Sequence, residues 1–155
     1  MNNNDVIRGI QQILKLNEAK ILDIFKLANY KIEVSTISNL LREEGNTDYL
    51  QCDDRLMTLL LDGLITSRRG KSDKTSSEVP ATFPPLTNNI IVKKLRIAFD
   101  LKEDDLIELL SLADYDVSKS ELSSIFRKPG HKHYRVCSDD LLMALLTGLT
   151  FRSCT

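Results

Sequence analysis

The sequence has little net charge of either sign, because 21 lysines and arginines stand against 22 aspartates and glutamates for a formal net charge of -1. This balance removes the general attraction to nucleic-acid backbones and acidic membranes that a strongly basic chain has. Long apolar runs are also missing, since none approaches the ~18 residues that a membrane span requires. The first residues, MNNNDVIRGI, lack the basic segment and apolar core of a signal peptide. We therefore expect a soluble protein with no membrane partner.

Cysteine is scarce as well, with Cys52, Cys137 and Cys154 widely spaced along the chain. An odd number of cysteines at such spacing is poor material for a disulfide framework and fits a reducing compartment. We accordingly predict a cytoplasmic protein. What the sequence does contain, 42% hydrophobic and 28% charged residues in a chain of 155, is typical of a globular protein with a genuine core.

The sequence contains an internal repeat at an offset of 85 residues, without a gap. Cys52 recurs as Cys137 and Gly63 recurs as Gly148. Other residues that recur at this offset are Tyr30 as Tyr115, Arg42 as Arg127, Gly45 as Gly130, Tyr49 as Tyr134 and Asp54 as Asp139. Such self-similarity indicates a tandem repeat. We predict a first repeat over residues 1–67 and a second over residues 88–155, packed together.

Residues 68–87 separate the two copies and hold three of the four prolines together with a run of Ser, Thr and Lys. This composition argues against helix or strand and predicts a linker.

Each copy has the apolar periodicity of four helices, so the predicted fold class is all-α. We expect Asn4 and Asn89 to cap the first helix of their copies, and Ser35 and Ser120 to begin the third. The fourth helix opens at Asp53 and Asp54 in the first copy, and at Ser138 and Asp139 in the second.

The fourth helices, DDRLMTLLLDGLI and SDDLLMALLTGLT, are apolar on nearly every face. A helix of this kind has to be surrounded by other elements, which places it at the centre of its unit. Glycine inside a helix costs about 1 kcal/mol relative to alanine. The recurrence of Gly63 and Gly148 inside these helices therefore predicts a close approach by another backbone.

The chain resembles the YehS-like family of bacterial proteins, which carry two tandem copies of one motif. The residues that support the resemblance are Asn88, Asn89, Lys94, Leu95, Arg96, Ile97, Ala98, Phe99, Arg127, Gly130, Tyr134, Cys137, Asp139 and Gly148. The resemblance implies a bacterial, cytosolic, helical protein. It assigns no catalytic residue, and we predict neither a cofactor nor a catalytic site.

The segment RKPGHKHYRVCSDD, residues 127–140, concentrates chemically active side chains. Its counterpart in the first copy, REEGNTDYLQCDDR, shares Arg, Gly, Tyr, Cys and Asp but lacks both histidines and most of the basic charge. Residues present in both copies are expected to be structural, and residues present in one are candidates for specificity. The candidate binding residues are Arg127, Lys128, His131, Lys132, His133 and Arg135.

Three chemical interpretations of this segment compete with a solvated loop. His131, His133 and Cys137 offer three zinc ligands and would need Asp139 or Asp140 as a fourth, without the usual paired spacing. Nucleophilic catalysis by Cys137, with His133 as the base, would need an orienting group and an oxyanion hole, and the sequence indicates neither. Neither a metal site nor catalysis is favoured.

Phosphate binding is the stronger chemical alternative, because the basic residues of the segment form a compact positive patch. A helix-turn-helix of the second and third helices is conceivable, yet TISNLLRE and ELSSIFRK contain few side chains that read base edges. Nucleic acid is therefore the alternative partner. The first prediction is a non-enzymatic protein-interaction or regulatory module that contacts a partner protein through one of the two unlike loops.

Overall fold

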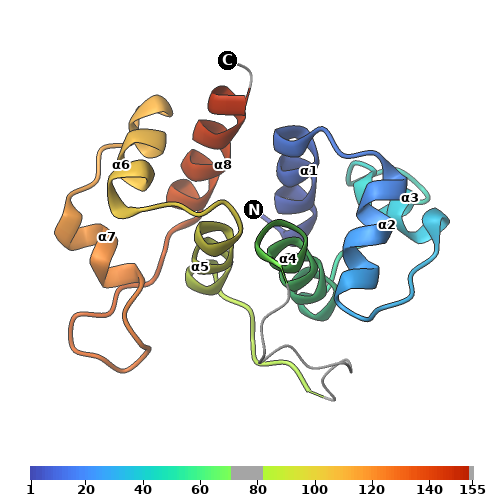
Figure 1. The fold of residues 1–155 in the computed structure, drawn as a ribbon, viewed down its shortest axis with the longest axis horizontal. Coiled ribbons are helices and arrows are strands. Elements are labelled where there is room, and N and C mark those ends of the chain that lie inside the picture. The colour runs from blue at the N-terminus through green and yellow to red at the C-terminus, as the bar shows by residue number, and fades with distance from the viewer. Residues whose placement is uncertain (71–81, 154–155) are drawn as a thin grey trace. The chain divides into compact units, whose positions relative to one another are not determined.

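The computed structural model describes residues 1–70 and 82–153, and all regular secondary structure in those ranges is helical. Two compact units divide the chain, Met1–Pro85 and Leu86–Thr155. The first unit contains α1 (Asn3–Leu14), α2 (Glu18–Leu27), α3 (Val34–Leu41) and α4 (Asp54–Arg69). The second contains α5 (Asn88–Ala98), α6 (Glu103–Leu112), α7 (Lys119–Ile125) and α8 (Asp139–Ser153), as Figure 1 shows. The all-α fold of two four-helix repeats is confirmed.

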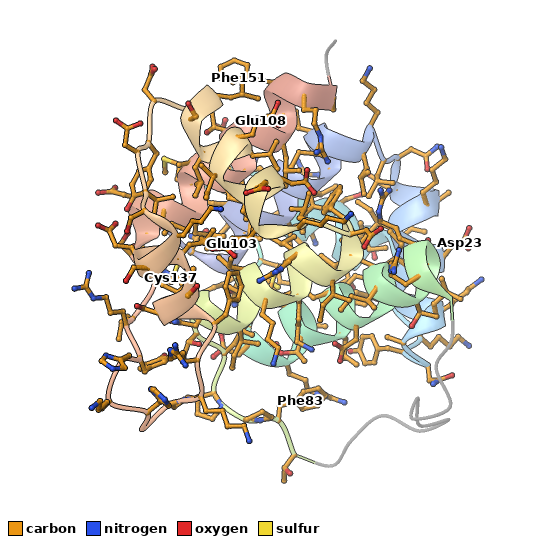
Figure 2. The ribbon with its side chains drawn as sticks, turned by 60° about the vertical axis from the view of Figure 1, so that its left-hand side comes forward. Asp23, Phe83, Glu103, Glu108, Cys137 and Phe151 are labelled. Atoms are coloured by element: carbon orange, nitrogen blue, oxygen red, sulfur yellow. The ribbon has the colours of Figure 1, made fainter. Side chains whose placement is uncertain are left out.

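The predicted linker falls partly outside the described residues, which omit 71–81. Helix α4 extends to Arg69. At the other end, the guanidinium carbon of Arg55 lies 5.5 Å from the ring centre of Tyr30 and 5.9 Å from that of Phe83, which is labelled in Figure 2. Residue 83 therefore contacts the first unit. The three-part division at residues 67 and 88, and the packing of the two repeats together, stay predictions.

The first helices begin two residues earlier than expected. Asn2 caps α1, with its side-chain oxygen accepting a hydrogen bond from the Asp5 amide at 2.9 Å, and Thr87 caps α5 through the Ile90 amide at 3.3 Å. The prediction that Asn4 and Asn89 are the caps is wrong. Both asparagines lie inside the first turn, where their side chains are buried.

The expected caps of the third helices are also wrong. Ser118 caps α7 by accepting from the Glu121 amide at 3.1 Å, and Glu33 precedes α3 without a side-chain capping bond. Ser35 and Ser120 are the second residues of α3 and α7. They therefore lie inside the first turn, whereas the side chain that caps a helix belongs to the residue just before it. The fourth helices begin as predicted, with Asp53 and Ser138 accepting from the amides three residues ahead.

The fourth helices form the buried element of each unit, as their composition predicted. Leu60, Leu61 and Leu64 of α4 are almost fully buried, as is Leu145 of α8. A Cβ added to Gly63 would overlap the carbonyl oxygen of Ile24 in α2. A Cβ added to Gly148 would overlap the carbonyl oxygen of Leu109 in α6. The predicted close approach of a second backbone is confirmed in both units.

No helix within the described ranges 1–70 and 82–153 is both long and apolar enough to cross a membrane.

Candidate functional site

The candidate site is the loop between α7 and α8, and the loop between α3 and α4 follows the same course. The His131 amide donates to the Lys128 carbonyl at 3.0 Å, and the Tyr134 amide donates to the His131 carbonyl at 2.9 Å. The corresponding bonds in the first unit, from Asn46 to Glu43 and from Tyr49 to Asn46, measure 3.1 and 3.0 Å. Two unlike sequences therefore share one backbone structure.

Glycine occupies the turn of each loop for a conformational reason. Gly45 has φ of 101° and Gly130 has φ of 94°. Side chains rarely tolerate this region, whereas glycine enters it freely. Each glycine therefore supplies the positive φ that its turn requires.

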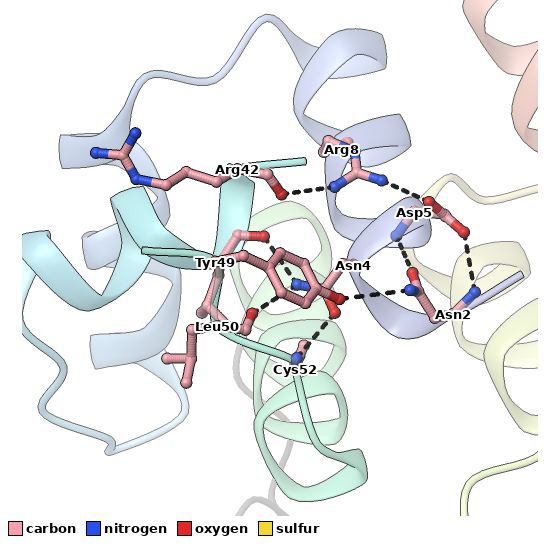
Figure 3. A network of polar contacts seen from close by, with 9 residues as sticks. Asn2, Asn4, Asp5, Arg8, Arg42, Tyr49, Leu50 and Cys52 are labelled. Carbon is pink, nitrogen blue, oxygen red and sulfur yellow. Dashed lines mark hydrogen bonds and ion pairs between the residues drawn. The ribbon is translucent and has the colours of Figure 1, made fainter. Parts of the chain in front are cut away.

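A buried asparagine anchors the first loop to α1, as Figure 3 shows. The Asn4 side-chain amide donates to the carbonyls of Leu40 at 3.0 Å and Leu50 at 2.8 Å. Its side-chain oxygen accepts from the Cys52 amide at 2.8 Å. One side chain thus satisfies three backbone groups at the two ends of the loop, and such groups are costly to bury without partners.

The second unit repeats this anchor at the offset of 85 residues. Asn89 donates to the carbonyls of Ile125 at 2.9 Å and Arg135 at 2.7 Å, and accepts from the Cys137 amide at 2.9 Å. We call this arrangement the asparagine clamp. Sequence reasoning missed it by assigning Asn4 and Asn89 to capping. The available signal was a polar residue that recurs in both copies beside an apolar helical stripe.

The preceding asparagines tie the loops to the fourth helices. Asn88 donates to the Cys137 carbonyl at 3.2 Å and to the Asp139 carboxylate at 2.7 Å. Asn3 makes the matching bonds to Cys52 and Asp54 at 3.1 and 3.0 Å. The hydrogen bond from Asn88 lowers the pKa of Asp139 below its ordinary value. The end of each loop is therefore held at both its backbone and its first helical carboxylate.

The two cysteines within the described chain are packing residues. Cys52 and Cys137 are 3% and 2% exposed. Burial, with Asp53 and Asp54 nearby, raises the pKa of Cys52 to about 12, and burial with Asp139 nearby raises that of Cys137 to about 11. Since the thiolate is the nucleophile, the structure contradicts the hypothesis of an activated Cys137. Cys154 lies outside the described residues.

The histidines lie apart from the cysteine. His131 and His133 are exposed, with ring centres 5.7 Å apart, and the His133 amide donates to Nδ1 of His131 at 3.0 Å. Cys137 is buried beneath the loop end. Over residues 1–70 and 82–153, no group of three or more His, Cys, Asp or Glu side chains is placed to hold a metal ion. The structure does not assemble the zinc set.

The six candidate binding residues are distributed over the loop and over two hollows on opposite faces of α7. Lys132, His133 and Arg135 line a hollow of about 250 Å³ together with one face of α7. Arg127 lines a separate hollow of about 320 Å³ against the opposite face of α7. Lys128 and His131 are exposed on the loop and line neither hollow. The remaining lining residues of the first hollow are Ser120, Glu121, Ser124 and Tyr134.

The recurring Arg42 makes its contacts near the end of α3. Arg42 donates from Nε to the Asn39 side chain at 3.2 Å, while its carbonyl accepts from Arg8 at 3.0 Å. The carboxylates of Asp54 and Asp139 accept from Asn3 and Asn88.

Comparison with known proteins places the repeat in a described family. The family model "Protein of unknown function (DUF1456)" matches residues 3–70 and again residues 88–153. The chain is 37% identical over 154 residues to "Uncharacterized protein YehS" of Escherichia coli (strain K12), covering 98% of this chain and 96% of that protein. No solved structure matches the chain.

Proposed function

Since the chain belongs to the DUF1456 family and carries its motif twice, we propose that it is a non-enzymatic protein-interaction or regulatory module. The partner protein binds the loop formed by residues 127–135, which we call the basic loop. Its acidic counterpart, residues 42–50, we call the acidic loop.

The observation that carries the proposal is the pairing of one loop structure with opposite charge. The basic loop contains four lysines and arginines and no carboxylate. The acidic loop contains Glu43, Glu44 and Asp48 against the single Arg42. Because the asparagine clamp is the same in both units, the fold does not require this charge difference. Charged side chains on the surface steer association and select partners.

The clamp also supports binding by fixing the loop before a partner arrives. The backbone of the basic loop is held by turn hydrogen bonds and by Asn89, at Lys128, His131, Tyr134 and Arg135. Ordering a flexible loop on binding would cost affinity, and a loop ordered in advance avoids that cost. We therefore expect an acidic surface on the partner, matched to an already structured basic loop.

A phosphate-bearing ligand, including nucleic acid, is the second candidate. Lys132, His133 and Arg135 surround one hollow together with the side chains of Ser120 and Ser124, and such groups are suitable donors to phosphate. Glu121 lies on the same wall and opposes an anion. With the net charge of -1, this makes a protein partner the better supported candidate.

The chain supplies a matched replacement for the experiment. Residues 128–135, KPGHKHYR, are exchanged for residues 43–50, EEGNTDYL, which already form the same turns. The natural and exchanged chains are used for affinity capture from native bacterial lysate treated with nuclease, and captured proteins are quantified by mass spectrometry. We expect specific proteins with the natural chain and their loss with the exchanged chain.

Equal capture by both chains would refute binding through the basic loop. The second candidate has a separate readout in samples purified without nuclease. With no tryptophan and four tyrosines the protein absorbs weakly at 280 nm, so bound nucleic acid raises the ratio of absorbance at 260 and 280 nm. A high ratio that the loop exchange abolishes would favour nucleic acid over a protein partner.

A further inference from the structure

A hollow of about 320 Å³ lies in the second unit between α5, the start of α6 and α7. It is lined by Arg96, Glu103, Leu122, Ser123, Phe126 and Arg127. Its volume falls at the lower end of the range for small-molecule sites. Glu103, the first residue of α6, is labelled in Figure 2.

Arg96 is held in position by two contacts. Its Nε–H donates to the Leu101 carbonyl at 3.1 Å, and its guanidinium carbon lies 4.7 Å above the ring centre of Phe126. A cation over an aromatic face is attracted by the ring. Across the described part of the chain, the terminal amino groups of Arg96 make no hydrogen bond or ion pair. The guanidinium is thus fixed while its two outer nitrogens stay available as donors.

The remaining lining makes the hollow suitable for a monoanion with an apolar part. Arg127 brings a second guanidinium and Ser123 brings a hydroxyl, while Glu103 supplies one opposing carboxylate. The half-buried ring of Phe126 supplies apolar surface. Guanidinium and carboxylate match as planar groups that form two parallel hydrogen bonds. Two positive charges against one negative charge leave a net charge of +1, which a single carboxylate neutralises.

The first unit shows that the guanidinium of Arg96 and the ring of Phe126 are not needed for folding. The residue at the position of Arg96 is Gln11, and the residue at the position of Phe126 is Leu41. Gln11 donates to the Leu16 carbonyl at 3.3 Å, which is the counterpart of the bond from Arg96 to Leu101. Glutamine therefore performs the structural role of Arg96, and the guanidinium and the ring under it are additions of the second unit.

We propose that the hollow lined by Arg96, Ser123 and Arg127 is a binding site for the carboxylate group of a small ligand whose apolar part lies against Phe126. This site is separate from the hollow of Lys132, His133 and Arg135. Arg127 is also the first residue of the basic loop, so the two proposals share this one residue.

The full chain, labelled with ¹⁵N, is titrated with 3-phenylpropionate and with the neutral 3-phenylpropionamide while backbone amide shifts are recorded. We expect the carboxylate to shift the amides of Ser123, Phe126 and Arg127 with a dissociation constant on the order of 1 mM. The amide has the same shape without the charge and should bind at least about tenfold more weakly, because charge-assisted hydrogen bonds are lost.

Arg96→Gln uses the residue that the first unit already carries, and it should weaken carboxylate binding about tenfold. Arg127→Gln, at an exposed position, gives a second test should Arg96→Gln fail to fold. The control is Lys93→Gln, which makes the same charge change at an exposed position of α5 that does not line the hollow. We expect that variant to bind like the natural chain.

Three results would overturn the proposal. One is equal binding of 3-phenylpropionate and its amide. Another is unchanged binding in both Arg96→Gln and Arg127→Gln, or an equal loss in Lys93→Gln. The third is competition by inorganic phosphate at lower concentrations than 3-phenylpropionate, which would assign the hollow to phosphate.

Discussion

At the scale of single residues, the uncharged side chains of Asn4 and Asn89 hold the backbone of the candidate loops in place. Each closes three hydrogen bonds to backbone groups far along the sequence. Their side chains are 0% and 7% exposed, so a replacement leaves donors and acceptors that water does not readily reach.

We predict that Asn89→Ala destabilises the second unit by about 3 kcal/mol or more, because the carbonyls of Ile125 and Arg135 and the amide of Cys137 lose their partner. Native-state hydrogen exchange at the Cys137 amide measures this effect within the second unit. Asn88→Ala, which removes more exposed bonds, should cost about 1 kcal/mol. Equal protection of Cys137 in Asn89→Ala and the natural chain would disprove the clamp.

A second prediction concerns the thiols. In a Cys154→Ser chain, Cys52 and Cys137 should react with a disulfide reagent at pH 8 at least about a hundredfold more slowly than a free thiol, because their raised pKa values suppress the thiolate. Denaturant should restore the ordinary rate. A fast reaction of either cysteine in the folded chain would show that its thiol is accessible to solvent and would contradict the prediction.

The raised pKa values of the two thiols also determine how the stability of the chain changes with pH. The folded pKa values of about 12 and 11 lie above the ordinary 9.0, so the unfolded chain loses these protons first as pH rises. The thiol contribution to stability is therefore complete below pH 9 and declines above it, as the unfolded thiols ionise.

At the scale of elements, the crossings of α2 with α4 and of α6 with α8 set the close packing of each unit. Both crossings depend on a glycine inside the long helix, since a Cβ there would overlap a carbonyl of the neighbouring helix. Helix propensity alone favours alanine over glycine by about 1 kcal/mol, so packing and propensity oppose each other at these positions.

We predict that packing prevails, and that Gly148→Ala destabilises the second unit by about 2 kcal/mol through the forced separation of α6 and α8. Urea denaturation followed by circular dichroism measures the change. Thr147→Ala, at the neighbouring half-buried position, is the control and should have a small effect. A stability gain in Gly148→Ala would show that the two backbones do not meet there.

The elements also show what the sequence could predict. The helices and the glycine crossings follow from periodicity and from comparison of the copies, which report directly on buried faces. The caps could not be placed the same way, because Asn2 and Asn4 are both suitable cap residues and only the position of the first turn separates them. The division of the basic residues by α7 was equally hidden, since adjacency in sequence does not say which face of a short helix a neighbour covers.

At the scale of the whole molecule, duplication separates what the fold needs from what a binding site needs. Glycine turns, asparagine clamps and buried cysteines occur in both units. The basic loop, Arg96 and Phe126 occur only in the second. The two proposals rest on this second group, together with Ser123 and Arg127, which recur in the first unit as Ser38 and Arg42. The first unit supplies a matched replacement for the basic loop and for Arg96.

The claim that both units share one interchangeable frame is tested most directly by a chain in which residues 43–50 and 128–135 are exchanged with each other. Amide hydrogen exchange at Cys52 and Cys137 is the measurement, because these amides bond to the two clamp asparagines. We predict protection within about 1 kcal/mol of the natural chain at both residues, since the clamps bind the loops through backbone groups. Loss of protection at either residue would show that each loop fits only its own unit and would contradict the account.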